Sequence, residues 1–340
     1  MIAWYRRAVS TIEARLRLFD QIVRNHPTEP VHLLKSASEV PASMETTDRI
    51  LSGLRNPRSI FHHMHWRYCR QLRGKTGTKL MERDWDNLII LDACRYDLFA
   101  ECHSLPGELS KVVSAGSHTV EFLHANFDGR KFPDTVYVTA TPQFEKEEMS
   151  DRFAYVEHVW RDGWDENLRT IPPMTVAERT SEVVERFPKK RVIAHFVQPH
   201  YPFIGETGRE LEGTIQAKTG LEPNERDDLS IWDQLEAEKI DEDTIWKAYR
   251  ENLELTIPIV RELCEELPGK TVVTSDHGNS FGRWGLYGHP SRKFIDELVN
   301  VPWLEFPVSE RREIVSGELS QSDASDASVE ERLRSLGYKT

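Results

Sequence analysis

Short runs of apolar residues in the middle of the chain alternate with longer segments in which apolar residues recur every three or four positions. The short runs are rich in Val and Ile and have the length of buried strands. They predict four strands, at residues 87–91, 135–139, 191–197 and 271–274. Because strands that alternate with helices form a mostly parallel sheet with helices on both faces, the pattern predicts an α/β fold.

The clearest helical patterns cover residues 176–187 and residues 243–266. Prolines mark their limits, since Pro188 follows the first segment and Pro268 follows the second. Pro258 lies inside the second segment and predicts a kink, because proline lacks the N–H group that a helix interior requires. The sequence therefore predicts two long helices with defined ends.

Charge is distributed unevenly along the chain, whose formal net charge is −12. Residues 1–80 hold 14 Lys and Arg against 6 Asp and Glu, so this part carries +8 and the remainder −20. The pattern predicts a basic helical extension at 1–80, a body at 81–310, and an acidic flexible tail with a short terminal helix at 311–340. The acidic body argues against nucleic acid as the main substrate.

The first 24 residues have apolar positions at helical spacing, with most arginines off that face. Two interpretations fit: an amphipathic helix that packs on its own domain, and one that lies on an anionic membrane surface. No apolar run approaches the roughly 20 residues that cross a bilayer, and the N-terminus has no apolar core followed by a cleavage site. We therefore expect a cytoplasmic protein with reduced thiols, which in the second interpretation is associated with the inner face of the membrane.

Polar residues follow the predicted strands at the points where each strand ends, which is where ligands bind in an open α/β sheet. Two carboxylates and three imidazoles stand there or in a nearby loop: Asp92, His200, Asp276, His277 and His289. Asp oxygens and His nitrogens together suit Mn or Zn, and oxygens alone suit Mg or Ca. The alternative for each of these residues taken singly is a helix cap or a packing role.

The order of these residues resembles that of a known family. The chain reads LDACRYD at residues 91–97, PHYPF at 199–203, TSDHG at 274–278, YGHP at 287–290 and LRSLGY at 333–338. The set resembles the alkaline phosphatase superfamily, above all its sulfatase-like branch, over residues 83–305 and the tail. The resemblance implies a three-layer sandwich with a mostly parallel central sheet. It also implies ester chemistry at a phosphorus or sulfur centre, with a metal-bound nucleophile at a helix N-terminus.

The resemblance makes Thr119 the candidate nucleophile, in the stretch SAGSHTVEFL at residues 114–123. Thr119 would open a helix over residues 120–126, where free N–H groups and the helix dipole favour an anionic ester oxygen. Ser117 is the second candidate. The alternative for both hydroxyls is a helix cap, because caps favour the same residue types.

The resemblance further implies one divalent ion, which would be Mn, Mg, Ca or Zn. Its ligands would be Asp92, Thr119, Asp276 and His277. His200 and His289 would contact substrate oxygens and supply a proton, or else hold a second metal. Arg95 would bind the anionic oxygens of the ester, and the alternative for it is an ion pair with Asp97.

Two features depart from the family pattern. Neither Cys94 nor Cys102 stands in the C-x-P-x-R or C-x-A-x-R motif of formylglycine-dependent sulfatases, so that type of activity is not expected. Gln198 stands where relatives often have an Asp, and the lost charge favours one ion over two. In this the chain is closer to lipoteichoic acid synthase and phosphoethanolamine transferases.

The sequence thus leads to the hypothesis of a metal-dependent hydrolase or transferase of phosphoric or sulfuric esters. Its substrates would be glycan or lipid-linked esters, an expectation that comes from the resemblance. Trp160, Trp164 and Trp284 would stack on sugar rings or else pack within the body. The alternatives are a catalytically reduced metal-binding scaffold and a peripheral membrane enzyme that transfers phospho groups.

Overall fold

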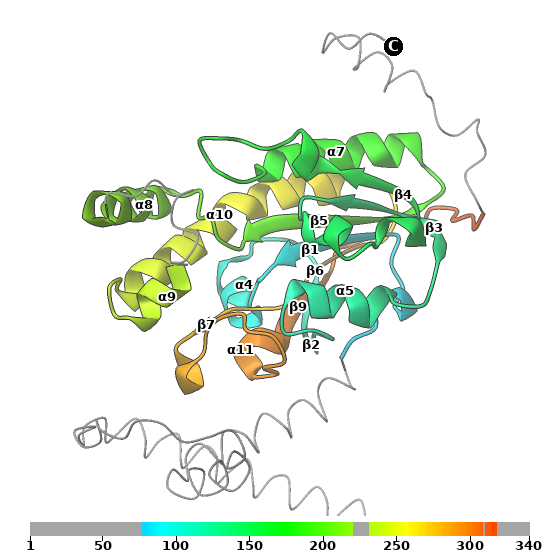
Figure 1. The fold of residues 1–340 in the computed structure, drawn as a ribbon. Helices are drawn as coiled ribbons and strands as arrows, with labels where there is room; N and C mark the ends of the chain where they lie inside the picture. Colours follow the sequence, from blue (N-terminus) through cyan, green and yellow to red (C-terminus); the bar gives the residue numbers. More distant parts are fainter. Residues whose placement is uncertain (1–76, 220–230, 309, 318–340) are drawn as a thin grey trace, which may run out of the picture. The chain divides into compact units, whose positions relative to one another are not determined.

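The computed structural model describes residues 77–219, 231–308 and 310–317 of the chain (Figure 1). Most of the predicted basic extension, including the proposed membrane-contacting residues 1–24, lies outside the described residues. The predicted terminal helix of the tail also lies outside them. Among the helices of the described part, none is both long and apolar enough to cross a bilayer.

Seven strands form one sheet in the order β2-β9-β6-β1-β5-β3-β4. Their bounds are β1 (Asn87–Asp92), β2 (Glu108–Val113), β3 (Phe132–Thr139), β4 (Phe153–His158), β5 (Arg191–Pro199), β6 (Thr271–Ser275) and β9 (Asn300–Glu305). Five neighbouring strands, from β6 to β4 in this order, are parallel, whereas β9 runs antiparallel to β6 and to β2. The four predicted strands are confirmed as β1, β3, β5 and β6, all of them inner strands.

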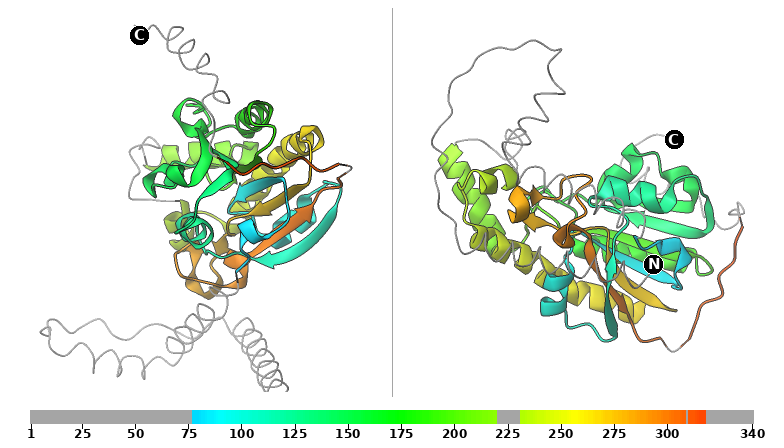
Figure 2. Two further views of the ribbon diagram at one scale, coloured as in Figure 1. Left: turned by 90° about the vertical axis from the view of Figure 1, so that its right-hand side faces the viewer. Right: turned by 90° about the horizontal axis from the view of Figure 1, so that it is seen from below.

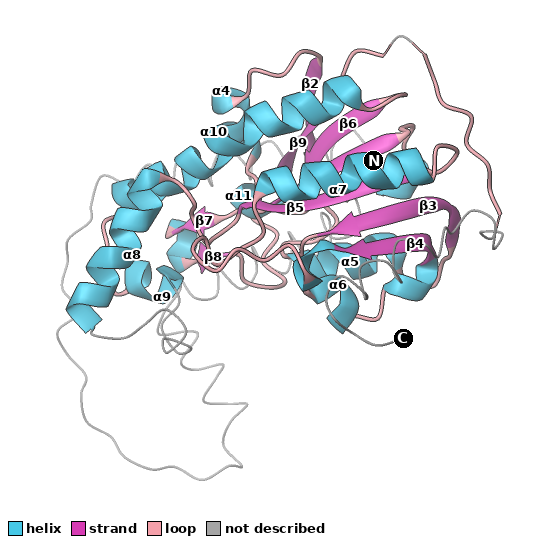
Figure 3. Ribbon diagram, turned by 90° about the horizontal axis from the view of Figure 1, so that it is seen from above, coloured by secondary structure: helices cyan, strands magenta, loops and turns pink. Residues whose placement is uncertain are grey.

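Helices cover both faces of this sheet. The α-helices are α4 (Tyr96–Cys102), α5 (Thr119–Phe127), α6 (Gln143–Lys146), α7 (Pro173–Arg186), α8 (Glu206–Thr219), α9 (Ile231–Glu236), α10 (Glu242–Glu266) and α11 (Asp296–Val299). Single 3₁₀ turns lie at η1 (Leu80–Glu82), η2 (Ser150–Arg152), η3 (Val159–Arg161) and η5 (Arg283–Gly285), and β7 (Ser280–Phe281) pairs with β8 (Tyr287–Gly288). Helices α7 and α10 lie on one face and α5 on the other (Figure 2; Figure 3). The predicted α/β sandwich with a mostly parallel sheet is therefore confirmed.

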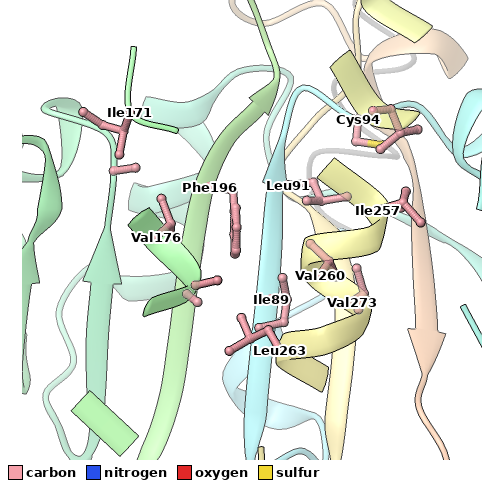
Figure 4. Close-up of a cluster of buried hydrophobic side chains, with 14 of the residues drawn as sticks. Ile89, Leu91, Cys94, Ile171, Val176, Phe196, Ile257, Val260, Leu263 and Val273 are labelled. Atoms are coloured by element: carbon pink, nitrogen blue, oxygen red, sulfur yellow. The ribbon is translucent and has the colours of Figure 1, made fainter. Parts of the chain in front are cut away.

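Successive residues of the inner strands point to opposite faces, which produces two cores. On β1, Ile89 and Leu91 share a core with α7 and α10, whereas Leu88 and Ile90 share the other with α5. Figure 4 shows the first core, where Ile89 and Leu91 lie beside the side chains of α10. Burying such a side chain contributes about 1.5–3 kcal/mol to the stability of the fold. Apolar packing on both faces therefore fixes β1 between the two layers.

Both predicted long helices are confirmed, with small shifts at their ends. The first is α7, which begins at Pro173 because proline is suited to the first helical position, where its missing N–H would be unpaired in any case. The second is α10, whose start is capped by the Asp241 carboxylate, which accepts a hydrogen bond from the backbone N–H of Thr244. Pro258 lies inside α10, and the helix ends at Glu266 as predicted.

Residues 311–317 begin the segment predicted to be a flexible tail, and they are bound to the body. The Arg311 guanidinium donates two hydrogen bonds to the buried Asp86 carboxylate, at 2.7 and 2.8 Å. Lys190 Nζ donates to the Val315 carbonyl at 3.1 Å. Burial opposes ionisation of Asp86, but hydrogen bonds from Arg311 and from a backbone N–H outweigh it and lower the pKa of this carboxyl. Ion pairing thus fixes the first residues of the tail.

We expect Arg311→Ala to lower the free energy of unfolding by about 1–3 kcal/mol at pH 7, because it leaves a buried carboxylate short of donors. A group whose folded-state pKa is lowered stabilises the fold above its unfolded pKa, and this is lost as the pH falls through the folded value. The difference from the natural chain should therefore fade below about pH 4. Urea denaturation at pH 7 and pH 3 measures both effects. Arg130→Ala, which removes an exposed arginine, serves as control, and an equal loss in both variants would contradict the assignment.

Candidate active site

Two neighbouring strands bring the predicted carboxylates together. Strands β1 and β6 are adjacent and in register, with Leu91 opposite Ser275, so both end at the same level of the sheet. Asp92 is the last residue of β1, and Asp276 follows β6 directly. Their side chains therefore meet at the carboxyl edge of the sheet, where the sequence places them.

Three metal-ligating groups converge at this edge. One ligand atom from each of Asp92, Asp276 and His277 lies within 4.8 Å of the other two. His277 Nε2 lies 3.4 Å from Asp92 Oδ1 and 3.3 Å from Asp276 Oδ2. Thr119 Oγ1, on the first residue of α5, lies 3.1 Å from the same Nε2 atom. The structure thus brings together all four predicted ligands of a single ion.

The ligand atoms of Asp92, Asp276 and His277 face one another. His277 Nδ1 lies 2.9 Å from the Gly278 carbonyl, to which its N–H donates, so a neutral His277 presents the lone pair of Nε2 to the carboxylates. Asp92 Oδ1 and Asp276 Oδ2 are buried and have no hydrogen-bond partner among the described residues. A divalent cation fits such a set of oxygen and nitrogen atoms, because it would satisfy every one of them.

Burial also shifts the pKa values of these three groups. It raises the pKa of both carboxyl groups, and the charge of Asp276 raises the pKa of Asp92 further. Burial also holds the pKa of His277 well below its usual value, and neighbouring histidines add to this effect. The charged forms of two nearby acids are thus unfavourable here, and a bound cation is the group that reverses this.

The carboxylate of Asp276 is fixed on one side by the backbone. Its Oδ1 accepts hydrogen bonds from the N–H groups of Ala93, at 3.0 Å, and of His277, at 2.7 Å. Ser275 Oγ accepts from Cys94 N at 2.9 Å and donates to the His277 carbonyl at 2.7 Å. These bonds join the segments after β1 and β6 and leave Oδ2 of Asp276 directed at the site.

Three further histidines surround the cluster. His200 Nε2 and His289 Nε2 are 2.8 Å apart, and the rings of His277 and His289 are 4.7 Å apart. His118 Nδ1 accepts the backbone N–H of Val120 at 2.9 Å, so His118 caps α5 beside the candidate nucleophile. Burial lowers the pKa of His200 and His289, which favours their neutral forms.

A cavity of about 470 Å³ opens onto these residues. Asp92, His118, Thr119, His200 and His289 line one part of it. The other walls are mostly apolar and aromatic and include Tyr201, Ile171, Ile231, Trp164 and Trp232. The site therefore combines a polar end, where a charged group would react, with an apolar wall that would hold the rest of a substrate.

Two predicted candidates lie elsewhere. The Ser117 hydroxyl is buried and donates to Glu121 Oε2 at 2.8 Å, and Ser117 does not line the cavity. The Arg95 guanidinium donates to Asp97 Oδ1 at 2.8 Å, stacks on Trp246 and likewise does not line the cavity. For Arg95 the structure thus shows the ion pair that was the alternative, and we do not include Arg95 in the proposed machinery.

Sequence reasoning missed Arg169, which lines the cavity. Its guanidinium donates to the Tyr201 hydroxyl at 2.9 Å and lies 3.2 Å from Glu212 on α8. Of the three tryptophans considered for substrate contact, Trp164 lines the cavity and is 50% exposed. Trp160 and Trp284 pack against hydrophobic clusters instead.

Comparison with known proteins gives matches at the level of structure. No protein-family model and no curated protein sequence matches the chain significantly. The chain is similar to the soluble domain of lipooligosaccharide phosphoethanolamine transferase A from Neisseria meningitidis, with 14% identity and a TM-score of 0.43 over 65% of this chain and 75% of that one. It is also similar to the C-terminal periplasmic domain of EptC from Escherichia coli in complex with Zn, with 14% identity and a TM-score of 0.39 over 67% and 75%.

A third similar structure is a protein in the alkaline phosphatase superfamily from Vibrio parahaemolyticus, with 10% identity and a TM-score of 0.38 over 68% of this chain and 62% of that one. This last structure is described as belonging to the alkaline phosphatase superfamily, which is the family that the motifs of this chain resemble. The predicted resemblance is therefore confirmed at the level of the fold.

The prediction of a cytoplasmic location has to be corrected. The similar EptC structure is described as a periplasmic domain, which contradicts the expected location at the inner side of the membrane. That expectation relied on the absence of an apolar span or leader in the sequence, and such an absence does not identify a compartment. We therefore withdraw it.

We expect Zn²⁺ or Mn²⁺ to raise the melting temperature of the full chain and not that of Asp276→Asn, which loses a charged ligand. At a metal concentration of 100 times the Kd, binding adds about 2.7 kcal/mol, which corresponds to a rise of about 5 °C. Thermal unfolding with and without EDTA measures this. Asp151→Asn, on an exposed residue outside the cluster, is the matched control and should keep the full rise. An equal rise in Asp276→Asn would contradict the assigned ion site.

Proposed function

We propose that this protein is a metal-dependent enzyme that hydrolyses or transfers phosphoric or sulfuric esters, with Thr119 as its nucleophile. The observation that carries the proposal is the position of the Thr119 hydroxyl. It stands at the first turn of α5, 3.1 Å from His277 Nε2, and it borders the cavity. The Thr119 hydroxyl therefore lies both beside the proposed cation site and at the cavity through which a substrate would enter.

The ion would be held by Asp92, Asp276, His277 and Thr119. A divalent cation supplies two effects there, because it lowers the pKa of a hydroxyl group and offsets the negative charge of an ester. The positive end of the dipole of α5 favours negative oxygens at the same place. Together these groups suit an anionic tetrahedral ester.

The bond changes follow from this arrangement. Thr119 Oγ1 gives up its proton to water and attacks the phosphorus or sulfur atom, and a bond from Oγ1 forms as the bond to the leaving oxygen breaks. The leaving oxygen takes up a proton and departs as an alcohol. Water in a hydrolase, or an acceptor alcohol in a transferase, then attacks the group on Thr119 and restores the hydroxyl. Both activities share the first half of this sequence.

His289 is the proposed source of that proton. The His200 ring bonds to the Tyr201 carbonyl through Nδ1, so Nδ1 carries the proton of a neutral His200 and Nε2 accepts. The 2.8 Å contact between the two Nε2 atoms then requires His289 to donate. His289 would take up a proton from water to become an imidazolium, pass that proton to the leaving oxygen and return to its neutral form.

His118 adds a second donor beside the nucleophile. Because Nδ1 accepts from Val120 N, a neutral His118 carries its proton on Nε2, on the opposite side of the ring. His118 lines the cavity, and we propose that this N–H donates to an ester oxygen. The helix cap thereby fixes the tautomer that the reaction requires.

The apolar wall indicates the shape of the rest of the substrate. Trp164, Trp232 and Tyr201 offer flat rings, which pack well on a sugar or an aromatic group. We therefore propose an ester whose alcohol part carries such a ring, and glycan esters belong to this class.

Thr119→Ala should reduce kcat by at least about 10³-fold on whichever ester the protein turns over, because no other group replaces the attacking oxygen. Aryl phosphate, aryl phosphodiester and aryl sulfate with Mn²⁺, Mg²⁺, Ca²⁺ or Zn²⁺ form the test panel. Thr175→Ala, on a threonine outside the cavity, is the control. Activity that survives in Thr119→Ala would move the nucleophile to water. Metal binding without turnover of any ester would favour a metal-binding scaffold.

His118→Ser should lower kcat by about 10²-fold with little change in melting temperature, because serine can still cap α5 but presents no donor to the cavity. His118→Ala should lose the same activity and also about 1 kcal/mol of stability, because the cap is lost. Parallel kinetics and thermal unfolding separate the two roles. Full activity in His118→Ser would limit His118 to capping the helix.

A further inference from the structure

A buried histidine behind the ion site has no role in the mechanism above. His195 lies on β5 and is completely buried. Its Nδ1 is 2.9 Å from the Tyr137 hydroxyl, and its Nε2 is 3.8 Å from Asp276 Oδ2. His195 Nε2 and Asp276 Oδ2 have no hydrogen-bond partner among the described residues. His195 therefore lies between the Tyr137 hydroxyl and a proposed metal ligand.

The surroundings determine which nitrogen of His195 carries the proton. A neutral imidazole has one N–H group and one lone pair. A lone pair on Nε2 would face the carboxylate oxygen of Asp276, which is unfavourable, so the N–H belongs on Nε2. Nδ1 then accepts a hydrogen bond, and the Tyr137 hydroxyl is the group placed to donate it. The donors of these side chains thus point in one direction: the Tyr137 hydroxyl toward His195, and the His195 N–H toward the Asp276 carboxylate.

Aromatic packing holds the Tyr137 ring in place. The Tyr137 ring is fully buried, with ring centroids 4.2 Å from Phe144, 5.1 Å from Phe153 and 5.8 Å from Phe127. A phenol hydroxyl in such a cluster must find a partner, and His195 is the one that the structure provides. A phenylalanine would fill the same space, so what the Tyr137 hydroxyl adds to packing is its contact with His195.

The two oxygens of the Asp276 carboxylate have different neighbours. Backbone N–H groups of Ala93 and His277 fix Oδ1, whereas Oδ2 faces both the ion site and His195. A donor behind a ligating carboxylate sets its orientation and tunes its affinity for metal. We propose that Tyr137 and His195 are positioning residues that orient Asp276 for the divalent cation. This inference rests on the ion site of the proposed function.

The test is the affinity of the full chain for Zn²⁺, measured by competition with a chromogenic chelator. We expect Tyr137→Phe, which removes only the hydroxyl, to raise the Kd about 3- to 10-fold, and His195→Gln to raise it about 10- to 100-fold. In the double variant Tyr137→Phe should add nothing to His195→Gln, because the hydroxyl acts through the imidazole. Tyr155→Phe is the matched control, since its hydroxyl bonds to Glu157 away from the site and its loss should leave the Kd unchanged.

Each outcome decides the matter. An unchanged Kd in Tyr137→Phe and His195→Gln, with both variants folded by circular dichroism, would overturn the inference. Independent effects that add in the double variant would overturn the relay through His195. If the natural chain binds Zn²⁺ and the variants weaken it as expected, but no ester is turned over, the proposed reaction fails while this inference stands. A natural chain that binds no divalent metal would overturn both.

Discussion

Negative charge buried at the end of two parallel strands is the constraint on which the site depends. Asp92 and Asp276 lie on neighbouring segments and share their surroundings with an imidazole nitrogen that offers only a lone pair. Among the described residues, no group forms a hydrogen bond with Asp92 Oδ1 or Asp276 Oδ2. In the proposed function, a divalent cation held there would offset this repulsion and activate the nearby Thr119 hydroxyl, so charge balance and catalysis would have the same cause.

The surrounding fold provides rigidity where this repulsion would otherwise separate the strands. Two cores hold β1 from both sides, and hydrogen bonds from Ser275 join the segments after β1 and β6. The aromatic cluster around Tyr137 supports the site from beneath. The unfavourable electrostatics of two neighbouring buried carboxyl groups are thus balanced by apolar packing, which is the usual arrangement at functional sites.

The sequence predicted the parts of the fold and site that local patterns determine. Val- and Ile-rich runs identified the four inner parallel strands, and the ends of two of them identified Asp92 and Asp276. Strands β2 and β4 were missed because they are edge strands with mostly exposed or half-buried residues, and β9 was missed because Pro302 interrupts its apolar pattern. Short polar edges give little signal.

The residues that were missed depend on contacts distant in sequence. His195 sits inside an apolar strand, so only its neighbours reveal a role. His118 caps a helix although histidine is not among the preferred caps, and Arg169 is placed by a loop. Conversely, Arg95 fitted the motif, but the adjacent Asp97 provides a nearer partner than a substrate would. Spacing identifies ligands, whereas partners must be seen in three dimensions.

The walls of the cavity and the ion cluster come from different parts of the chain. Trp164, Arg169, Ile231 and Trp232 belong to segments that contribute no ligand to the cluster. If the proposed function holds, substitutions in those segments alter which alcohol is accommodated without disturbing the charge balance of the ion cluster. In evolutionary terms, selectivity and reactivity can change independently, so chains with the same ion cluster can diverge toward different esters by exchanging loops alone.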